Sequence, residues 1–564
     1  MNVTQAFTAP SPGSWELEQT HLTKPPSVLL GELVPSSMMR GFSEGTRHYG
    51  LLLDHLEIAI VNRFLYMAPR PVGAPKSSKG TPPRLVFEVL RRLHPAIRQR
   101  VKRAGEVLRD RVWRADIEWW DNEVRPTLAA EARALLKDDL ASLSDAQLVA
   151  HLQLAFEFVR SATFYHHRFN FCSMVPLGDF LVHAIAWTGL PAGELLRTMK
   201  GLSPDSAGAT AELAELRCAL LADSEALTLL TSRGRGDRDV MAALEAHPGP
   251  VGNAMRAYLA VVGLRVLGGY DIADPHGREH PELIVKIIRF AVTADPASRQ
   301  AAAEDALQKI RARVPEAHRE QFDDLLREAQ TTYRMRDERG FHTDTLAVGV
   351  ARRAVLAAGD RLKARGLVHD PSHLVDATTG EIVALLEGRQ GPTADELAQR
   401  VRWRLETPLS TAPQRLGHPP SDPPPAEWLP PDAARLQRIT TLVMSLMFDV
   451  HAAPPAETAR LKGFPVSPGV YEGPVRVIKS IEELPDVQQG EVLVATSTGP
   501  TFNVVLPLIG ALVTERGGVL SHAAIVSREY GLPGVVGCVG ATKQLRTGMR
   551  VRVDGGSGEV WTLT

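Results

Sequence analysis

Cysteine is scarce in this chain of 564 residues, which has only Cys172, Cys218 and Cys538. The three are far apart in the sequence and form no CxxC pair, and their odd number argues against a disulfide framework. We therefore expect a reducing compartment and predict a cytoplasmic location.

An excess of charge of one sign is also lacking, because 64 Lys and Arg residues face 65 Asp and Glu residues, for a net charge of −1. No global field then draws the protein to nucleic acid or to an anionic membrane. Residues 91–114 do carry nine basic side chains against two acidic ones. Because this excess is not sustained, a solvated helix surface is favoured over a nucleic-acid-binding face.

Long hydrophobic runs are missing as well. The longest runs, such as Val504–Val513, have about half of the ~20 apolar residues that a transmembrane helix needs. The first residues (MNVTQAFTAPSPGSW) contain neither a basic segment nor an apolar one. We expect no signal peptide and no membrane partner.

The remaining composition, 44% hydrophobic and 23% charged, is typical of a soluble protein with several domains. Residues 1–80 are mixed, and Leu56–Met67 fits a strand as well as a helix. From Arg84 to about Gly366, apolar residues recur at three and four positions and predict helices. We predict one large, mostly α-helical domain over residues 1–406.

Proline marks the boundary of this helical domain. Nine prolines lie between Pro408 and Pro431, which predicts an extended, semi-rigid linker. One helix follows at about Asp432–Val450, and a second joint (AAPPAETARLKG) follows at 452–463. Residues 407–463 are therefore predicted to be a linker, a helix and a hinge.

Short β-rich runs begin at about Phe464 and predict a compact α/β domain over residues 464–564. The expected strands are Gly473–Ile478, Glu491–Thr496, Ala511–Thr514, Gly534–Val536, Arg550–Asp554 and Gly558–Leu563.

One stretch of this domain, Val513–Gly537 (VTERGGVLSHAAIVSREYGLPGVVG), carries recognisable chemistry. Gly517 and Gly518 allow a tight turn and the close approach of another molecule. Ser521 is a good N-cap, and a short helix is expected to end before Gly531. His522 is therefore predicted in the first turn of a helix, beside a glycine turn.

The first turn of a helix presents unpaired N–H groups and about half a positive charge. This setting favours a phosphoryl group and a neutral imidazole. A neutral imidazole can attack phosphorus and then carry the phosphoryl group. The alternative for a single histidine is a packing role, and the surrounding pattern favours the chemical one.

The pattern GG-x-x-SHAAIV-x-RE-x-G-x-P-x-VVG resembles the phosphohistidine (swivelling) domain of the enzymes that use phosphoenolpyruvate or make phosphohistidine from ATP. The segments GFPVSPGVYEGPVRVI, GEVLVA and VRVDGGSGEV agree with it. The resemblance implies that His522 carries the phosphoryl group and that Gly517, Gly518, Ser521 and Arg528 bind it. The chain departs from the usual pattern at Ser527 and Leu520. Leu520 replaces a regulatory threonine of plant dikinases, which argues against that type of regulation.

The resemblance also has expected gaps. We expect no β/α barrel for pyruvate or phosphoenolpyruvate after the C-terminal domain and no ATP-grasp domain before the helical one. The segment GAPKSSKGT in the 71–83 loop lacks the Walker spacing and is expected to be a solvated loop. We therefore expect a separate ATP-grasp subunit that supplies ATP and Mg²⁺, with no tightly bound cofactor and no metal site on this chain.

Two helical segments are weakly similar to the same family. Val262–Pro281 matches at Arg265, Asp271 and Glu279, which are predicted to bind substrate or phosphate, and Tyr333–Gly340 (YRMRDERG) matches at Arg336 and Asp337. Arginine suits an incoming phosphoryl group, and Asp337 or Asp271 would take the proton of an acceptor hydroxyl. The family's lysine position holds Gly340. A surface or buried salt bridge is the competing interpretation for each residue.

Tyr165–Arg168 (YHHR) places two adjacent histidines on a helical stretch. They could line an acceptor pocket, although packing is favoured. Adjacent residues on a helix point to different faces, so the two histidines are not expected to bind one metal ion together.

Together these observations predict a phosphotransferase component of the dikinase type. It would take a phosphoryl group from ATP onto His522 and pass it to a hydroxyl of a small phenol or alcohol, which the helical domain (residues 1–406) is expected to bind. The alternatives are a rifamycin-type antibiotic phosphotransferase component and a non-catalytic phosphoryl carrier that binds a partner.

Overall fold

A small antiparallel sheet at the start of the chain is built from segments that are far apart in sequence. The computed structural model of the chain describes residues 6–202, 211–232, 234–267, 269–293, 301–448, 460–499, 502–503 and 505–563. The order of strands in this sheet is β2-β3-β1-β4. They are β1 (Ser14–Leu17), β2 (Leu53–Val61), β3 (Phe64–Pro71) and β4 (Arg415–Gly417).

Two features of this sheet decide points that the sequence left open. The stretch Leu56–Met67 is a hairpin, with Asn62 and Arg63 at positive φ in its turn. The proline-rich stretch supplies β4, in which Leu416 pairs with Trp15. The stretch is therefore tied back to the N-terminal sheet rather than extended along its whole length.

The chain divides into two compact units. The first unit contains residues 1–175, 270–274 and 339–439, and the second contains residues 176–269, 275–338 and 440–564. Each unit therefore combines segments that are distant in sequence, and each is described by itself below.

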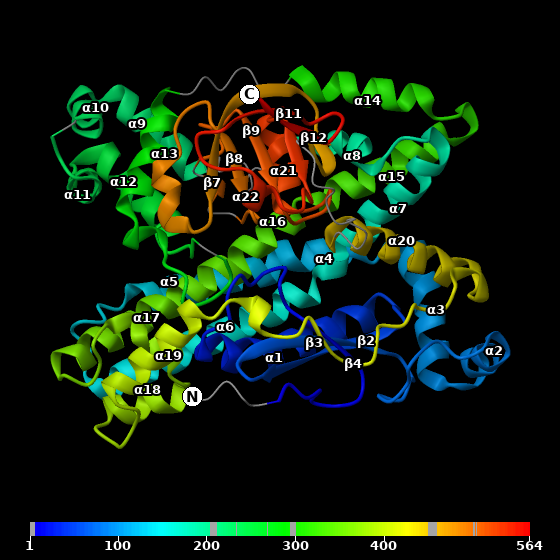
Figure 1. Cartoon of the computed structure of the whole chain (residues 1–564), viewed down its shortest axis with the longest axis horizontal. Helices are drawn as coiled ribbons and strands as arrows, with labels where there is room; N and C mark the ends of the chain where they lie inside the picture. Colours follow the sequence, from blue (N-terminus) through cyan, green and yellow to red (C-terminus); the bar gives the residue numbers. More distant parts are fainter. Residues whose placement is uncertain are drawn as a thin grey trace. The chain divides into compact units, whose positions relative to one another are not determined.

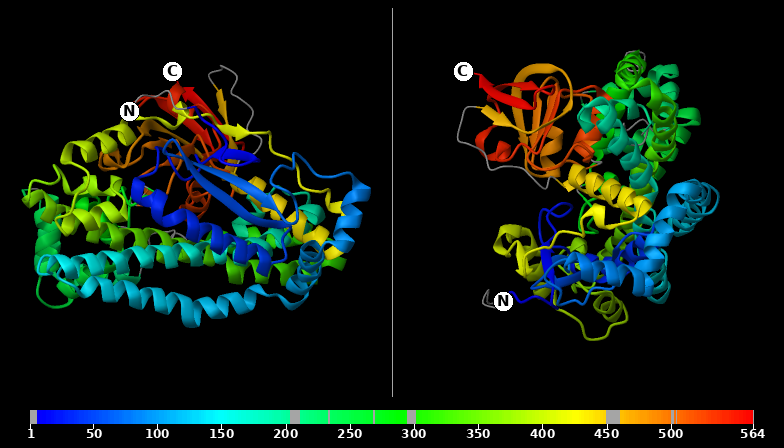
Figure 2. Two further views of the ribbon diagram at one scale, coloured as in Figure 1. Left: turned by 90° about the horizontal axis from the view of Figure 1, so that it is seen from below. Right: turned by 90° about the vertical axis from the view of Figure 1, so that its right-hand side faces the viewer.

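Helices make up most of the rest of the first unit, and several of them pack against one another or against the sheet (Figures 1 and 2). They are α1 (Val28–His48), α2 (Arg84–Leu93), α3 (Pro95–Asp110), α4 (Trp113–Trp119), α5 (Arg125–Lys137), α6 (Asp145–Arg168), α17 (Leu346–Ala364), α18 (Thr379–Leu386) and α19 (Ala394–Glu406). Two π-helical turns, η1 (Trp120–Val124) and η6 (Gly340–Thr345), and the 3₁₀ turns η7 (Pro371–Asp376) and η8 (Leu409–Thr411) join them.

Glycine allows the closest helix contact of the first unit. Gly41 and Gly45 lie one turn apart on α1 and face the main chain of α6. A Cβ at Gly41 would overlap the carbonyl oxygen of Phe164, and one at Gly45 would lie 3.0 Å from that of Arg168. These two glycines therefore set the position of the last turn of α6.

The helices of the second unit surround a C-terminal sheet. They are α7 (Asn170–Thr188, which begins in the first unit), α8 (Ala192–Leu195), α9 (Ala211–Ala222), α10 (Ser224–Thr231), α11 (Asp237–Ala246), α12 (Gly249–Val262), α13 (Pro281–Thr293), α14 (Ala301–Arg313), α15 (Arg319–Tyr333), α16 (Met335–Arg339), α20 (Pro431–Phe448), α21 (His522–Tyr530) and α22 (Ala541–Gln544). Short 3₁₀ turns are η2 (Leu196–Met199), η3 (Gly277–Glu279), η5 (Glu316–His318) and η10 (Ile481–Asp486).

The C-terminal sheet has eight strands in the order β5-β12-β11-β7-β8-β9-β10-β6 (Figure 1). They are β5 (Arg460–Lys462), β6 (Phe464–Ser467), β7 (Val470–Ile478), β8 (Val492–Ala495), β9 (Ala511–Thr514), β10 (Gly534–Val536), β11 (Arg550–Asp554) and β12 (Glu559–Leu563). Strands β7 to β10 are parallel neighbours, and the outer pairs are antiparallel. The six expected strands are confirmed, while β5 and β6 were not anticipated.

The helix predicted after the linker is confirmed as α20. Of the predicted hinge at 452–463, residues 452–459 lie outside the described residues, and 460–462 form β5. Among the described residues, one apolar stretch, Asp145–Thr188 (α6 and α7), is long and apolar enough to cross a membrane. Of its most apolar window, 67% is buried inside the molecule, which is typical of a core helix.

The packing of α1 on α6 makes a prediction about stability. Gly41→Ala should lower the free energy of unfolding by about 1–3 kcal/mol, because the added methyl group displaces the α6 main chain. Gly31→Ala is the matched control on the same helix, where the nearest atoms to a Cβ lie 3.6 Å away. This control should be neutral or slightly stabilising, since Ala favours a helix. Thermal unfolding of both variants measures the difference, and equal melting temperatures would contradict the packing argument.

Candidate functional site

The site lies where two parallel strands end. Ala495 at the end of β8 pairs with Thr514 at the end of β9. The carboxyl ends of parallel strands meet at one edge of the sheet, where α/β folds place their ligands. The segment after β8 brings Thr498 to this edge, and the segment after β9 brings His522.

The local structure around His522 agrees with the sequence prediction. Helix α21 begins at His522, and the side chain of its N-cap Ser521 accepts a hydrogen bond from the backbone N–H of Ala524 at 3.4 Å. The helix ends at Gly531 in the left-handed conformation, with φ of 66°. His522 therefore lies at the positive end of a short helix.

The two nitrogens of the His522 ring have different surroundings. Nδ1 lies 3.0 Å from the hydroxyl oxygen of Thr498, whereas Nε2 is buried and makes no hydrogen bond with a described residue. When Nδ1 carries the proton and donates it to Thr498, the lone pair is on Nε2. This arrangement makes Nε2 the nucleophilic nitrogen.

Burial, and then the positive charge of Arg336, lower the pKa of His522 to about 3. The imidazole is therefore neutral at neutral pH, which is the form that attacks phosphorus. The arginine that disfavours the imidazolium is also a suitable partner for a phosphoryl group, which is negatively charged.

The glycine turn before His522 contacts the chain itself. Gly517 has φ of +107°, which favours glycine. A Cβ at Gly518 would overlap the carbonyl oxygen of Leu446 in α20, and this carbonyl accepts a hydrogen bond from Leu520 N at 3.1 Å. The close approach predicted from these glycines is thus made by α20. Phosphate binding by Gly517, Gly518 and Ser521 remains a prediction.

Arg528 supports the same loop from inside. Its guanidinium is buried and donates to the carbonyl oxygens of Val519 at 2.9 Å and Val466 at 3.4 Å. Burial lowers its pKa, and Tyr333 opposes this shift. Arg528 therefore positions the histidine loop, and direct phosphate binding by it remains a prediction.

The structure brings Arg336 and Asp337 of α16 to this site. Arg336 Nη2 donates to the carbonyl oxygen of Leu520. The Oδ2 atom of Asp337 is buried without a hydrogen-bond partner among the described residues. Nearby, both carboxylate oxygens of Glu529 accept from Gly201 N at 2.8 and 3.0 Å. Burial raises the pKa of Glu529 to about 7, and the charge of Asp337 adds to the shift.

The other predicted residues have contacts elsewhere. Asp271 belongs to the first unit and is buried there, where it accepts from Ser27 N at 2.7 Å and from the hydroxyl group of Ser27. Arg265 and Glu279 belong to the second unit, where Glu279 accepts from His276 N at 2.9 Å and caps η3. Asp271 and Glu279 thus have structural contacts, and substrate binding by all three remains a prediction.

Sequence reasoning missed Thr498 and Glu529. A signal for Thr498 existed, because the polar run TSTGPT directly follows a buried strand that is parallel to the one before His522. Glu529 is adjacent to Arg528 in the motif, but its partner Gly201 is distant in sequence.

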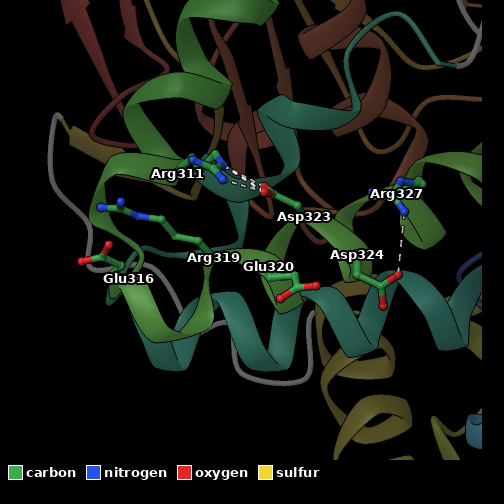
Figure 3. Close-up of a pocket in the computed structure, with 7 residues that line it drawn as sticks. All are labelled: Arg311, Glu316, Arg319, Glu320, Asp323, Asp324 and Arg327. Atoms are coloured by element: carbon green, nitrogen blue, oxygen red, sulfur yellow. Dashed lines mark hydrogen bonds and ion pairs between the residues drawn. The ribbon is translucent and has the colours of Figure 1, made fainter.

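A separate cavity of about 630 Å³ lies on the second unit (Figure 3). Its charged side chains come from α14, η5 and α15 and largely pair with one another, as in the Arg311–Asp323 ion pair at 2.7 Å. Figure 3 shows no aromatic or apolar side chain among those that line it. It therefore offers little for an organic acceptor. No group of three His, Cys, Asp or Glu residues that could hold a metal ion occurs within the described ranges.

Comparisons with known proteins match two regions of the chain. Residues 487–558 match the family described as PEP-utilising enzyme, mobile domain, and residues 174–337 match the rifampicin phosphotransferase fourth domain. Both matched regions lie largely in the second unit and together contain His522 and Arg336.

Similar proteins carry related names. Rifampicin phosphotransferase of Streptomyces sviceus is 30% identical over 59% of this chain and 37% of that protein. A probable phosphoenolpyruvate synthase of Pyrococcus horikoshii is 46% identical over 22% of this chain and 15% of that protein. The uncharacterized phosphotransferase YvkC of Bacillus subtilis is 29% identical over 44% of this chain and 28% of that protein.

Residues 487–558 are therefore similar to the mobile domain of the PEP-utilising enzymes, and residues 174–337 are similar to the fourth domain of rifampicin phosphotransferase. This confirms the resemblance on which the prediction of a phosphohistidine domain rests. The matched region spans little more than a third of the Streptomyces sviceus relative.

The buried site makes a prediction about the titration of His522. The ¹³Cε1 and ¹Hε1 signals of His522, assigned with His522→Ala, should stay at neutral-imidazole positions from pH 8 to about pH 5. A solvated histidine titrates near pH ~6.5. Arg336→Gln should move the midpoint upward, because Arg336 lowers the pKa. NMR of histidine-labelled protein tests both points, and a midpoint near 6.5 in the wild type would contradict the buried, neutral imidazole.

Proposed function

We propose that this chain is the phosphoryl-carrying component of a dikinase-type phosphotransferase. His522 receives a phosphoryl group from ATP held with Mg²⁺ on a separate ATP-grasp partner and passes it to a hydroxyl of a small phenol or alcohol. The observation that carries the proposal is the neutral imidazole of His522, with its buried Nε2 at the start of a helix and Arg336 beside it. The match to a PEP-utilising mobile domain supports the same role.

The chemistry takes two displacements. In the first, the Nε2 lone pair attacks the β-phosphorus of ATP, the N–P bond forms and the P–O bond to AMP breaks. Water then takes the γ-phosphoryl group as inorganic phosphate, which leaves one phosphoryl group on Nε2. In the second, the acceptor oxygen attacks, the O–P bond forms, the N–P bond breaks and the acceptor proton passes to a base. The proposal includes movement of the mobile domain about residues 452–463, because one histidine must visit two sites.

The residues around His522 would have distinct roles. Thr498 holds the ring through Nδ1, and Arg336 stabilises the negative charge of the phosphoryl group. Asp337 is the candidate proton acceptor on α16 that the sequence suggested. Arg528 and the glycine turn hold the loop in place.

A second candidate function is a component of a rifamycin-type antibiotic phosphotransferase. It is favoured by the relative named rifampicin phosphotransferase and by the match of residues 174–337 to the fourth domain of that enzyme. Rifampicin and phenol, tested separately as acceptors, distinguish this function from a small-phenol phosphotransferase.

Labelling of His522 tests the proposal. The purified chain, incubated with β-labelled ATP, Mg²⁺ and host-cell extract, should acquire an acid-labile, base-stable label that His522→Ala abolishes. His369→Ala is the matched control, because His369 is an exposed histidine whose side chain pairs with Asp395. Absence of label with a competent extract would overturn the carrier role. Label that no hydroxyl acceptor discharges would favour a non-catalytic carrier.

Arg336 offers a second test of the same site. Arg336→Gln should slow the phosphorylation of His522 by about 10²–10³-fold, which is typical of losing one donor that stabilises developing charge. Arg327→Gln is the control on the neighbouring helix α15, since Arg327 is 70% exposed and 3.9 Å from Asp324. Rapid-quench labelling measures both rates. A rate equal to wild type in Arg336→Gln would remove Arg336 from the phosphoryl site.

A further inference from the structure

A second polar cluster lies wholly within the first unit and has no part in the site at His522. Three segments that are distant in sequence contribute to it: the turn after β1, the junction of α6 and α7, and the π-helical turn η6. The cluster consists of Glu18, His21, His166, His167, Asn170, Arg339, Thr343 and Asp344. It contains the adjacent histidines for which the sequence left a pocket role open.

The centre of the cluster is a histidine–carboxylate pair. His166 Nδ1 lies 2.9 Å from Asp344 Oδ2 and 3.0 Å from the Thr343 hydroxyl. Both contacts are made by Nδ1, so the second ring nitrogen, Nε2, takes part in neither. A carboxylate on Nδ1 fixes the ring and its tautomer and leaves Nε2 as the proton acceptor, the arrangement of a general base.

The partners of His166 are held in place by the fold. Arg339 is buried and donates to the carbonyl oxygen of His166 at 2.8 Å and to the side-chain oxygen of Asn170. The Thr343 hydroxyl donates to the carbonyl oxygen of Arg339 at 2.6 Å. These contacts use the wider π-helical turn, a feature that is frequent at functional sites.

The centre of the cluster is mostly buried, while His21 at its edge is half exposed. The side chains of His166 and Asp344 are 17% and 15% exposed, and that of His21 is 48% exposed. His21 Nδ1 lies 3.1 Å from Glu18 Oε1, and its ring meets Tyr270 edge-on at 5.2 Å. An aromatic edge beside polar side chains suits a phenol better than a simple ion.

The charges favour a neutral His166. Burial, and then the positive charge of Arg339, lower its pKa, while Asp344 opposes the shift and the charge of His21 adds to it. Burial and the neighbouring His166 and Arg339 hold the pKa of His167 well below its usual value. For His21, burial acts to lower the pKa, but Glu18 and Asp344 raise it overall.

We propose that this cluster binds the acceptor and that His166 Nε2 takes the proton of its hydroxyl group. The inference rests on the proposed function. As the acceptor O–H bond breaks, the proton moves to Nε2; the oxygen forms the O–P bond and the N–P bond of phospho-His522 breaks. Asp344 stabilises the resulting imidazolium, and His21 and Arg339 place positive charge near the acceptor.

This assignment competes with Asp337 for the same proton. His166 is favoured by its geometry, because a carboxylate on Nδ1 holds its ring in the manner of a general base. The variants Asp337→Asn and His166→Asn therefore distinguish the two candidates. Only the variant that lacks the true base should fail to pass the label from His522 to the acceptor while it still acquires that label.

The test uses the full chain labelled on His522 and two probes, phenol and rifampicin. In a single turnover, His166→Asn should discharge the label about 10²–10⁴-fold more slowly than wild type, the usual contribution of a general base. Formation of the label should be unchanged. His369→Asn is the matched control, because its exposed pair with Asp395 has the same chemistry at 2.7 Å.

Two further measurements separate catalysis from a structural role. Added imidazole should restore part of the discharge by His166→Gly. In wild type, discharge should fall as pH falls through the lowered pKa of His166. Asp344→Asn should move this fall to lower pH, because Asp344 raises that pKa.

The outcomes distinguish the two proposals. Loss of discharge with intact label, imidazole rescue and a shifted pH profile support the role of His166. Wild-type discharge in His166→Asn overturns it and leaves the carrier function standing. If no label forms, or if neither probe discharges labelled wild type, the proposed function fails and this inference fails with it.

Discussion

The main chain of Val519 and Leu520 is held from three sides, and the position of His522 depends on these contacts. Leu446 in α20 accepts from Leu520 N, Arg336 donates to the Leu520 carbonyl and Arg528 donates to that of Val519. Only glycine at 518 allows α20 to come this close. The loop is thus held through its backbone, and a side chain at position 518 would disturb one of these contacts.

The same contacts explain the electrostatics of the site. Arg336 reaches the loop through a carbonyl group, which brings a positive charge beside His522. Together with burial, this charge keeps the imidazole neutral. A positive charge beside a neutral imidazole destabilises it little, whereas the same charge stabilises a phosphohistidine, which is negatively charged. The site is therefore better matched to the phosphorylated histidine than to the protonated one.

Polar chemistry is concentrated in two places, one in each unit. The second unit contains a histidine at a helix start with a cation, which suits phosphoryl transfer. The first unit contains a histidine held by a carboxylate, which suits proton transfer. Both histidines are neutral through burial and a nearby arginine, but the atoms bound to their Nδ1 differ: a hydroxyl group in one case, and a carboxylate with a hydroxyl group in the other. This difference matches the two roles that we propose, a nucleophile and a base.

The sequence by itself determined the local features of the mobile domain. Ser521, His522 and Gly531 could be placed at the start and end of a helix, because capping and chain reversal depend on neighbouring residues. The strands of the C-terminal sheet followed from short apolar runs. Tertiary structure alone decided which distant side chains meet: Thr498 and Arg336 at His522, Asp344 at His166, and Asp271 at the cap of α1. Such meetings depend on how helices and strands pack, and no spacing within a single segment specifies them.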